Sequence, residues 1–325
     1  MKTFIFFTLL IIFNTKSVAF AKDPIKMLIF TGYGTPNNVY LSGRVLENEG
    51  LKSPDSKRSA FKNLVDNVHR LESDEVKGAE IVVILEQQSW QCKTDNDGLW
   101  SIEAKNMHPS LTLGTHIVQV YLNTESAEPK GSGEVIIIDN KPSVAIVSDF
   151  DDTVVHSYIG NKWSMAKQAL LKNPAQQKPI DGVAAVYQAA AQAGAVAFFY
   201  VSGSPQNFYE RINDFLNFYK IPTGPLLLKN FGSDPLFEQE GYKTKRIDLL
   251  MQRFPKLKFI LIGDSGEHDP EVYAKTLEKY PNRVAGIFIR LVEKDKSPKE
   301  RFINMQTAPD YNNAIATITN WVKTK

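Results

Sequence analysis

The sequence predicts an α/β fold in which a mostly parallel sheet, with helices on both faces, follows a small β-sandwich. Short segments rich in β-branched and aromatic residues fill positions 27–140, and turn signals separate them. Beyond Asn140-Lys141-Pro142, apolar runs alternate with segments of helical periodicity. The length of 325 residues suits two domains, each large enough to bury a core.

Six segments of the first region have the composition of strands and predict a β-sandwich domain over residues 22–140. The clearest turns between them are Asp95-Asn96-Asp97-Gly98 and Lys130-Gly131-Ser132-Gly133. Apolar residues at helical spacing predict an inserted amphipathic helix over 58–72. Trp90 and Trp100 lie beside an expected hairpin, where they could form a binding surface or pack in the core. The expected strands are 27–31, 39–45, 80–85, 99–103, 117–122 and 134–138.

The second region, residues 141–325, alternates expected strands with expected helices. In a parallel sheet of this kind, ligands bind at the carboxyl ends of the strands. A final helix carries Tyr311, Ile315, Ile318, Trp321 and Val322, and it is expected to pack on this domain because it lacks the basic face of a membrane-surface helix. The expected strands are 144–147, 195–201, 259–262 and 284–289, and the other helices are 182–192, 206–218, 243–254 and 271–279.

Composition and charge exclude several classes of protein. The 43% apolar and 23% charged residues are typical of a globular chain and not of a fibrous or disordered one. The 38 basic and 36 acidic residues give no bulk charge that would indicate a nucleic-acid partner. Cys92 is the only cysteine, so no internal disulfide can form, and an ordinary strand residue is expected rather than a reactive thiol.

The first residues have the three parts of a secretory signal peptide. Lys2 precedes the apolar run 4–13, and Ala19-Phe20-Ala21 supplies a small-residue cleavage site. The apolar run is too short to span a bilayer, which needs about 20 such residues. Removal of residues 1–21 takes away two basic residues and no acidic one, leaving a neutral mature chain. The expected destination is the periplasm or the medium, without a stable transmembrane anchor.

Acidic residues follow two expected strands of the second domain. Asp149 and Asp151, in Asp149-Phe150-Asp151-Asp152-Thr153, come directly after the first strand, and Asp264 follows a later one. Neighbouring carboxylates repel unless a cation or proton intervenes, and hard oxygen ligands suit Mg²⁺. A solvated acidic turn is the alternative at Asp149. Asp269 could join Asp264 at a metal or could cap the next helix.

A hydroxyl and a lysine complete this edge of the expected sheet. Ser202, in Tyr200-Val201-Ser202-Gly203-Ser204-Pro205, ends the second strand, where backbone N–H groups of the next helix could help bind a phosphate oxygen; a simple turn is the alternative. Lys243 is expected to begin a helix, and a lysine there opposes the helix dipole unless it meets an anion. Lys245 is a rival for the same role.

This order of motifs resembles that of the haloacid-dehalogenase (HAD) superfamily of phosphotransferases over residues 143–290. A closer resemblance joins these motifs, with Gly224-Pro225-Leu226-Leu227-Leu228 and Gly263-Asp264-Ser265-Gly266-Glu267-His268-Asp269-Pro270-Glu271, to the actin-patch type phosphatidate phosphatase catalytic domain. The sandwich, with Gly32-Tyr33-Gly34 and Gly43-Arg44-Val45, is similar to that of bacterial members. Gly203, Gln206 and Lys229-Asn230 depart from the family's usual Ser, Trp and Arg-Asp, which puts the substrate in question more than the chemistry.

The resemblance implies a HAD-like Rossmannoid sheet and a role for each residue. Asp149 would attack phosphorus, Asp151 would act as general acid and base, and Thr153 would brace the loop. Ser202 and Lys243 would hold phosphoryl oxygens. The metal ligands of Mg²⁺ would be the Asp149 carboxylate, the Asp151 carbonyl oxygen, Asp264 and Asp269, the last directly or through water.

Three functions stay open at this point. The first is a Mg²⁺-dependent phosphatase acting on phosphatidate, a substrate suggested by the resemblance alone. The second keeps the chemistry but takes a soluble phosphomonoester or an isoprenoid phosphate. The third is a non-catalytic protein that binds a lipid or glycan, against which the complete set of expected catalytic residues counts. Trp163, Met165, Leu170 and Leu171, between the first two motifs, could form core, which helical spacing favours, or roof the site.

Overall fold

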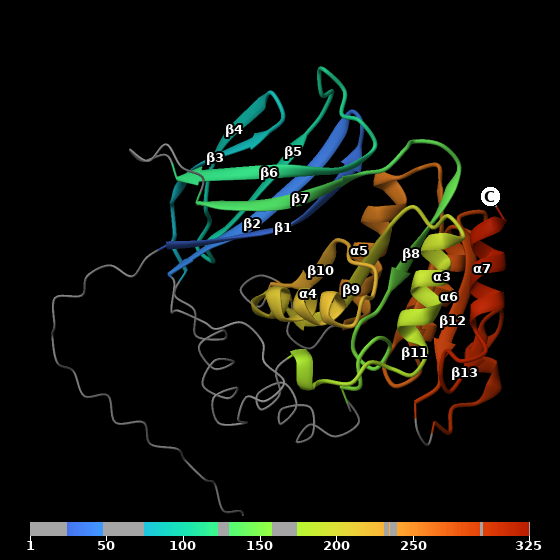
Figure 1. The fold of residues 1–325 in the computed structure, drawn as a ribbon. Coiled ribbons are helices and arrows are strands. Elements are labelled where there is room, and N and C mark those ends of the chain that lie inside the picture. The colour runs from blue at the N-terminus through green and yellow to red at the C-terminus, as the bar shows by residue number, and fades with distance from the viewer. Residues whose placement is uncertain are drawn as a thin grey trace, which may run out of the picture.

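The computed structural model describes residues 25–47, 75–122, 130–157, 174–230, 234, 239–292 and 295–324. Two sheets dominate it, and Figure 1 shows them as a curved β-layer above a sheet flanked by helices. The signal-peptide region, the expected helix 58–72 and the four apolar residues from Trp163 to Leu171 lie outside the described residues.

The first sheet contains seven strands in the order β4-β3-β6-β7-β1-β2-β5. One face of these strands encloses a single apolar core, which includes Val45, Ile81, Val83 and Val120. The strands therefore form one continuous sheet around one core rather than two separate sheets. Their bounds are β1 (Ile25–Thr35), β2 (Asn38–Glu47), β3 (Glu80–Leu85), β4 (Gln88–Lys93), β5 (Leu99–Ala104), β6 (Gly114–Leu122) and β7 (Gly131–Ile137).

Trp100 is buried in this core and Trp90 packs against it, so core packing accounts for both indoles. Cys92 lies half-buried in β4, and burial raises the pKa of its thiol, which disfavours the reactive thiolate. The tryptophans therefore pack in the core rather than form a binding surface, and Cys92 is an ordinary strand residue rather than a reactive thiol.

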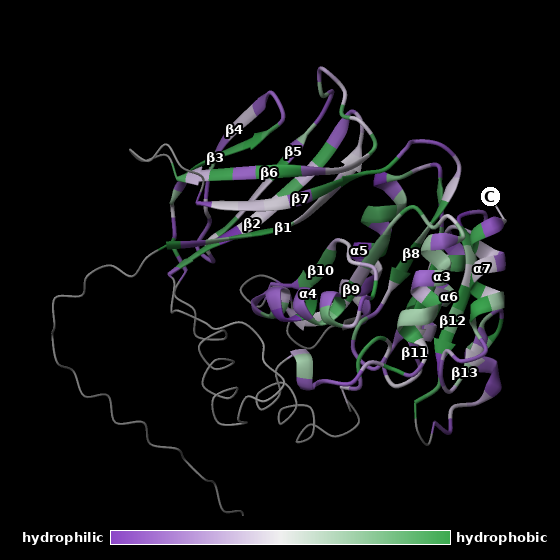
Figure 2. Ribbon diagram, in the orientation of Figure 1, coloured by the Kyte–Doolittle hydropathy of each residue, from purple (hydrophilic) through white to green (hydrophobic). Residues whose placement is uncertain are grey.

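The second sheet contains six strands, all parallel, in the order β10-β9-β8-β11-β12-β13. Its central strands are apolar along their length (Figure 2), as expected for strands covered on both faces. Their bounds are β8 (Ser143–Ser148), β9 (Phe198–Pro205), β10 (Leu226–Lys229), β11 (Leu257–Asp264), β12 (Val284–Arg290) and β13 (Gln306–Ala308).

Helices cover both faces of the parallel sheet. Side chains of β8 alternate between two cores, with Val144 and Ile146 in one and Ala145 and Val147 in the other. The first core includes side chains of α3 (Val183–Gln192), α4 (Tyr209–Phe218) and α7 (Ile315–Lys323). The second core includes side chains of α5 (Gln239–Arg253) and α6 (Asp269–Lys279). The predicted parallel sheet with helices on both faces is confirmed, and the final helix packs on it as expected.

The two regions share apolar cores. Leu28 and Phe30 of β1 belong to the core beneath α3 and α4, and Tyr33 of the same strand belongs to the core beneath α5. The Tyr209 hydroxyl also accepts the Thr31 backbone N–H at 2.7 Å. The second region is therefore packed directly against the first. Both cores of the parallel sheet include side chains of β1.

Candidate active site

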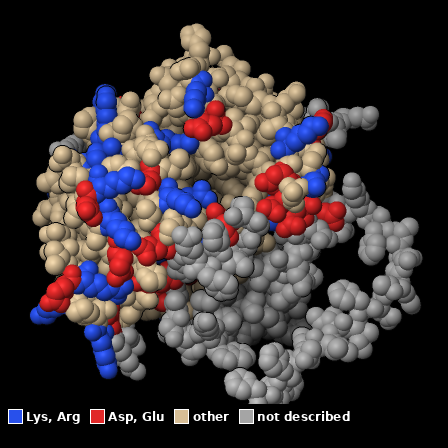
Figure 3. Space-filling view, turned by 180° about the vertical axis from the view of Figure 1, so that it is seen from behind, with Lys and Arg blue, Asp and Glu red and all other residues tan. Residues whose placement is uncertain are grey.

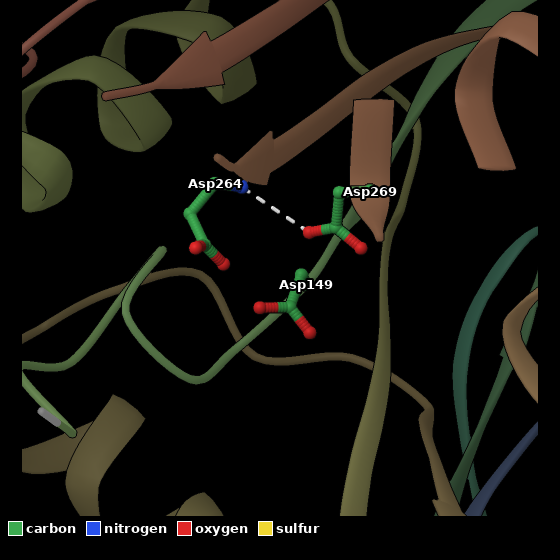
Figure 4. Close-up of side chains that lie close together, drawn as sticks. All are labelled: Asp149, Asp264 and Asp269. Carbon is green, nitrogen blue, oxygen red and sulfur yellow. Dashed lines mark hydrogen bonds between the residues drawn. The ribbon is translucent and has the colours of Figure 1, made fainter. Parts of the chain in front are cut away.

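The site forms at the carboxyl edge of the parallel sheet, where β8 and β11 lie side by side. Asp149 follows β8 and Asp264 ends β11, while Asp269 begins α6. Each of these three buried residues offers a carboxylate oxygen within 4.8 Å of the others, and Figure 4 shows the side chains converging. Asp149, Asp264 and Asp269 were predicted to hold a metal through their carboxylates, and the structure brings these three carboxylates together. The fourth predicted ligand was the backbone carbonyl oxygen of Asp151.

A glycine allows this close approach. A Cβ atom at Gly263 would lie 2.3 Å from Asp269 Oδ2, so any other residue there would displace that carboxylate. Asp269 Oδ2 accepts the Asp264 backbone N–H at 3.2 Å (Figure 4). The N-cap of α6 is His268, so the alternative prediction that Asp269 caps this helix is wrong; its carboxylate is turned back toward the end of β11.

Lys243 is the cation of this cluster. Its Nζ lies 2.9 Å from Asp149 Oδ1, 2.6 Å from Asp269 Oδ1 and 3.2 Å from Glu267 Oε2, and the side chain is buried. Lys245 is exposed, which favours Lys243 over its rival. The expected helix start is wrong, because α5 begins at Gln239 and Lys243 lies beyond its first turn. The lysine does meet anions, but at carboxylates that surround it inside the domain.

The cluster has an excess of negative charge. Burial raises the pKa values of Asp149 and Asp264 well above their usual range, and the mutual repulsion of the carboxylates adds to this. Burial alone would lower the pKa of Lys243, but Asp149, Asp269 and Glu267 outweigh it and hold that pKa well above its usual value. One ammonium cannot balance four carboxylates, so this site favours a further cation or bound protons.

The acidic cluster of Asp149, Asp264 and Asp269 suits a hard divalent cation. Asp149 Oδ2 is buried without a hydrogen-bond partner among the described residues, and Oδ1 meets Lys243 without hydrogen-bond geometry. Buried carboxylate oxygens are costly when left unpaired, and they are the preferred ligands of Mg²⁺. Asp269 is less available, because Lys243 and the Asp264 N–H already occupy its two oxygens.

The carboxylate of Asp151 is surrounded by hydroxyl groups. Ser202 Oγ and Ser204 Oγ donate to its Oδ2 at 3.0 and 2.7 Å, and Ser157 Oγ donates to Oδ1 at 2.7 Å. The predicted residues Asp151 and Ser202 therefore do lie together. Sequence reasoning missed Ser157 and Ser204, although Ser204 stands in the quoted Ser-Gly-Ser segment.

The loop after β8 is held from several sides. Thr153 is fully buried and its hydroxyl lies 3.4 Å from Asp264 Oδ2, while its carbonyl oxygen accepts the Tyr311 hydroxyl at 3.0 Å. Arg290, at the end of β12, donates to the carbonyl oxygen of Asp152, whose φ is +52°. Thr153 thus joins this loop to Asp264 and Tyr311, and Arg290 is a further contact that the sequence pattern did not single out.

Comparison with known proteins gives a family-model match over the region that contains this site. Residues 144–291 match the family model described as "Phosphatidate phosphatase APP1, catalytic domain". The matched stretch therefore resembles that catalytic domain. The chain is 37% identical over 154 residues to phosphatidate phosphatase APP1 of Saccharomyces cerevisiae, a match that covers 45% of the chain and 26% of the yeast protein.

A second relative is an uncharacterized protein of Schizosaccharomyces pombe, 30% identical over 166 residues, or 50% of the chain and 27% of that protein. The chain therefore spans about a quarter of the length of these curated relatives. Among solved structures, a chain of the Pnkp1/Rnl/Hen1 RNA repair complex aligns with a TM-score of 0.36 and 19% identity, covering 47% of this chain and 44% of the other. That likeness is too low to carry an argument.

Proposed function

We propose that the protein is a divalent-metal-dependent phosphatase that hydrolyses a phosphomonoester through a covalent intermediate on Asp149, with phosphatidate as its substrate. The observation that carries this proposal is the buried convergence of Asp149, Asp264, Asp269 and Lys243 at one strand edge. The family of residues 144–291 supports phosphatidate, the substrate named for the yeast relative. The same proposal assigns the catalytic region to the HAD superfamily and takes Mg²⁺ as the divalent cation. It also divides the chain into domains at residues 22–140 and 141–325.

In the first step an oxygen of Asp149 forms a bond to phosphorus while the bond from phosphorus to the leaving oxygen breaks. Asp151 gives its proton to that leaving oxygen, and Ser157 and Ser204 keep its carboxyl group oriented. In the second step a water oxygen attacks phosphorus, Asp151 takes the water's proton and the bond to Asp149 breaks. The products are an alcohol and inorganic phosphate.

In this proposal Lys243 and Ser202 hold the oxygens of the transferred group. The ammonium of Lys243 lies against the attacking carboxylate, where it can offset the charge of an incoming phosphate. Ser202 can turn its O–H from Asp151 toward a phosphoryl oxygen, while Ser204 retains Asp151. A bound Mg²⁺, held by Asp149, Asp264 and the Asp151 carbonyl oxygen with Asp269 in support, would supply charge neutralisation between the carboxylate and the phosphate.

The test measures phosphate release from phosphatidate, lysophosphatidate and a soluble aryl phosphate, with Mg²⁺ or with chelator. Wild type and Asp149→Asn should be compared, with Lys245→Ala as a variant at an exposed position. We expect Mg²⁺-dependent release from the lipids that is lost in Asp149→Asn and retained in Lys245→Ala. Release from the aryl phosphate alone would refute phosphatidate as substrate, and no release from any compound would favour the binding-protein alternative.

We further propose export, supported by the pattern of residues 1–21. Among the described residues, no helix combines the length and apolar character needed to cross a bilayer. Expression of the full chain in a Gram-negative host, followed by N-terminal sequencing of the protein in each fraction, tests export. A mature start near Lys22 in the periplasm or medium is expected, and an intact Met1 in the cytoplasm would contradict it.

A further inference from the structure

Arg301 lies outside the region matched by the family model, yet it contacts the loop that carries the acidic residues. The loop runs from Asp264, at the end of β11, to Asp269, at the start of α6. Arg301 stands in the short 3-10 helix Lys299–Phe302, which follows β12 in the chain. Its side chain is about one-fifth exposed, at 18%, so it is partly shielded from solvent.

All five N–H donors of the Arg301 guanidinium have an acceptor. Two of them form a bidentate ion pair with the carboxylate of Glu271, from Nε at 2.6 Å and from Nη2 at 2.9 Å. Nη1 donates to the Ser265 carbonyl at 2.6 Å and Nη2 to the Glu267 carbonyl at 2.6 Å. Nη1 also donates to Ser297 Oγ at 3.1 Å. Only arginine has five donors in a planar fork, so lysine could not replace this pattern.

The loop needs such a support because its own charges repel. Asp264, Glu267 and Asp269 project from six consecutive residues into one buried cluster, which Lys243 only partly balances. Arg301 holds the backbone on either side of Gly266, at the carbonyl groups of Ser265 and Glu267. The guanidinium therefore fixes the direction in which the carboxylates leave the loop.

We propose that Arg301 is a positioning residue that sets the Asp264–Asp269 loop in the geometry that binds the divalent cation. The proposal rests on the metal-dependent function proposed above. Among the described residues, no hydrogen bond or ion pair joins Arg301 to the carboxylate trio, so it acts through the loop. Residues that orient metal ligands in this way commonly change metal affinity about 10- to 100-fold when they are replaced.

Arg283 offers a matched control. Like Arg301 it donates to several backbone carbonyls, those of Met251, Phe254 and Leu257, but these precede or begin β11, at the opposite end of that strand. Arg301→Gln and Arg283→Gln both remove an arginine that joins backbone segments. Only the first change should alter the metal site.

The experiment measures Mg²⁺ binding to the mature full-length protein by calorimetry and by the rise in melting temperature with added MgCl₂. We expect Arg301→Gln to weaken Mg²⁺ binding at least tenfold, and Arg301→Lys to weaken it nearly as much. Glu271→Gln leaves both carbonyl contacts in place and should have a smaller effect. Arg283→Gln should lower the melting temperature without changing Mg²⁺ affinity. If Arg301→Gln does not fold, the Lys and Glu271 variants carry the comparison.

Unchanged Mg²⁺ affinity in folded Arg301→Gln or Arg301→Lys, with only a lower melting temperature, would overturn the proposal, as would the same loss of affinity in Arg283→Gln. Failure of wild type to bind Mg²⁺ would overturn it together with the metal-dependent function. Wild type that binds Mg²⁺ in this way but releases no phosphate would refute the proposed function and leave the role of Arg301 standing.

Discussion

Replacing Lys243 by methionine should destabilise the protein strongly, because the side chain is buried against three carboxylates. Its Nζ lies between 2.6 and 3.2 Å from Asp149, Asp269 and Glu267. Methionine fills a similar volume but leaves those charges without their ammonium. Breaking a buried ion pair by removing one partner costs about 3–5 kcal/mol, a large share of the roughly 5–15 kcal/mol by which a domain is stable.

The assay is urea unfolding of Lys243→Met, followed by tryptophan fluorescence without added metal. Lys245→Met is the matched control, because Lys245 is exposed on the same helix, and it should change the free energy of unfolding by less than about 0.5 kcal/mol. A loss below about 1 kcal/mol in Lys243→Met, or equal losses in the two variants, would refute the reasoning.

The pH dependence of Lys243→Met gives a second check. The folded-state pKa values of Asp149 and Asp264 are already raised by burial, and removal of the ammonium raises that of Asp149 further. A folded state with raised carboxyl pKa values binds more protons than the unfolded chain, so stability falls as pH rises through that window. The variant should therefore recover stability, relative to wild type, as the pH is lowered from about 7 toward about 5. A deficit that widens on acidification would contradict this.

Three further predictions follow from the packing. Burial raises the pKa of Tyr33 to about 12, so stability should fall as pH rises from about 10 to about 12, and Tyr33→Phe should make that fall shallower in urea unfolding. Gly263→Ala should displace Asp269 and cost about 1–3 kcal/mol, with Mg²⁺ binding weakened in calorimetry, whereas an unchanged affinity would contradict the close approach. A truncated protein of residues 141–325 lacks the apolar side chains that β1 contributes to its cores, each of which stabilises the fold by about 1.5–3 kcal/mol. Circular dichroism should therefore show a much lower melting temperature than for the full chain. An equal melting temperature would refute the shared cores.

The parallel sheet was predictable because its strands are apolar runs followed by acidic or hydroxyl residues. β8, β11 and β12 were predicted with ends at most two residues short, whereas β9 was predicted to start three residues too early and to end four residues too soon. In the first sheet, β3 was predicted with its observed bounds. Three strands were missed for physical reasons. β4 is an edge strand without fully buried residues, and β10 and β13 have only four and three residues. Such segments have too little periodicity to indicate a strand.

The site was predictable at the level of residue types and less so at the level of contacts. Asp149 and Asp264 could be singled out because each follows or ends an expected strand, and Asp269 because it stands where the next helix begins. Arg301 could not be singled out, since it is more than 30 residues from the loop whose carbonyl groups it contacts and has no motif around it. Net charge was uninformative, and on the face drawn in Figure 3 acidic and basic side chains lie close to one another.

Among the departures from the family pattern, Asn230 has a visible role. Its side-chain amide donates to Asp97 Oδ2 at 3.0 Å, which joins the segment after β10 to a turn of the first sheet. Arg44 donates to the Asp97 carbonyl and to Asn207 Oδ1, at 2.9 and 3.1 Å. The first sheet therefore supports the segments that follow β9 and β10, a link that neither turn composition nor strand periodicity could indicate.

The most direct test of the central claim is to look for a phosphoryl group on Asp149 itself. Asp151→Asn, which lacks the carboxyl group needed to deprotonate the attacking water, should be mixed with an activated aryl phosphate and Mg²⁺, quenched in acid and analysed by peptide mass spectrometry. The account predicts a phosphoryl group on the peptide that contains Asp149, and none in Asp149→Asn. Turnover by wild type without any such adduct, or an adduct on another residue, would contradict it.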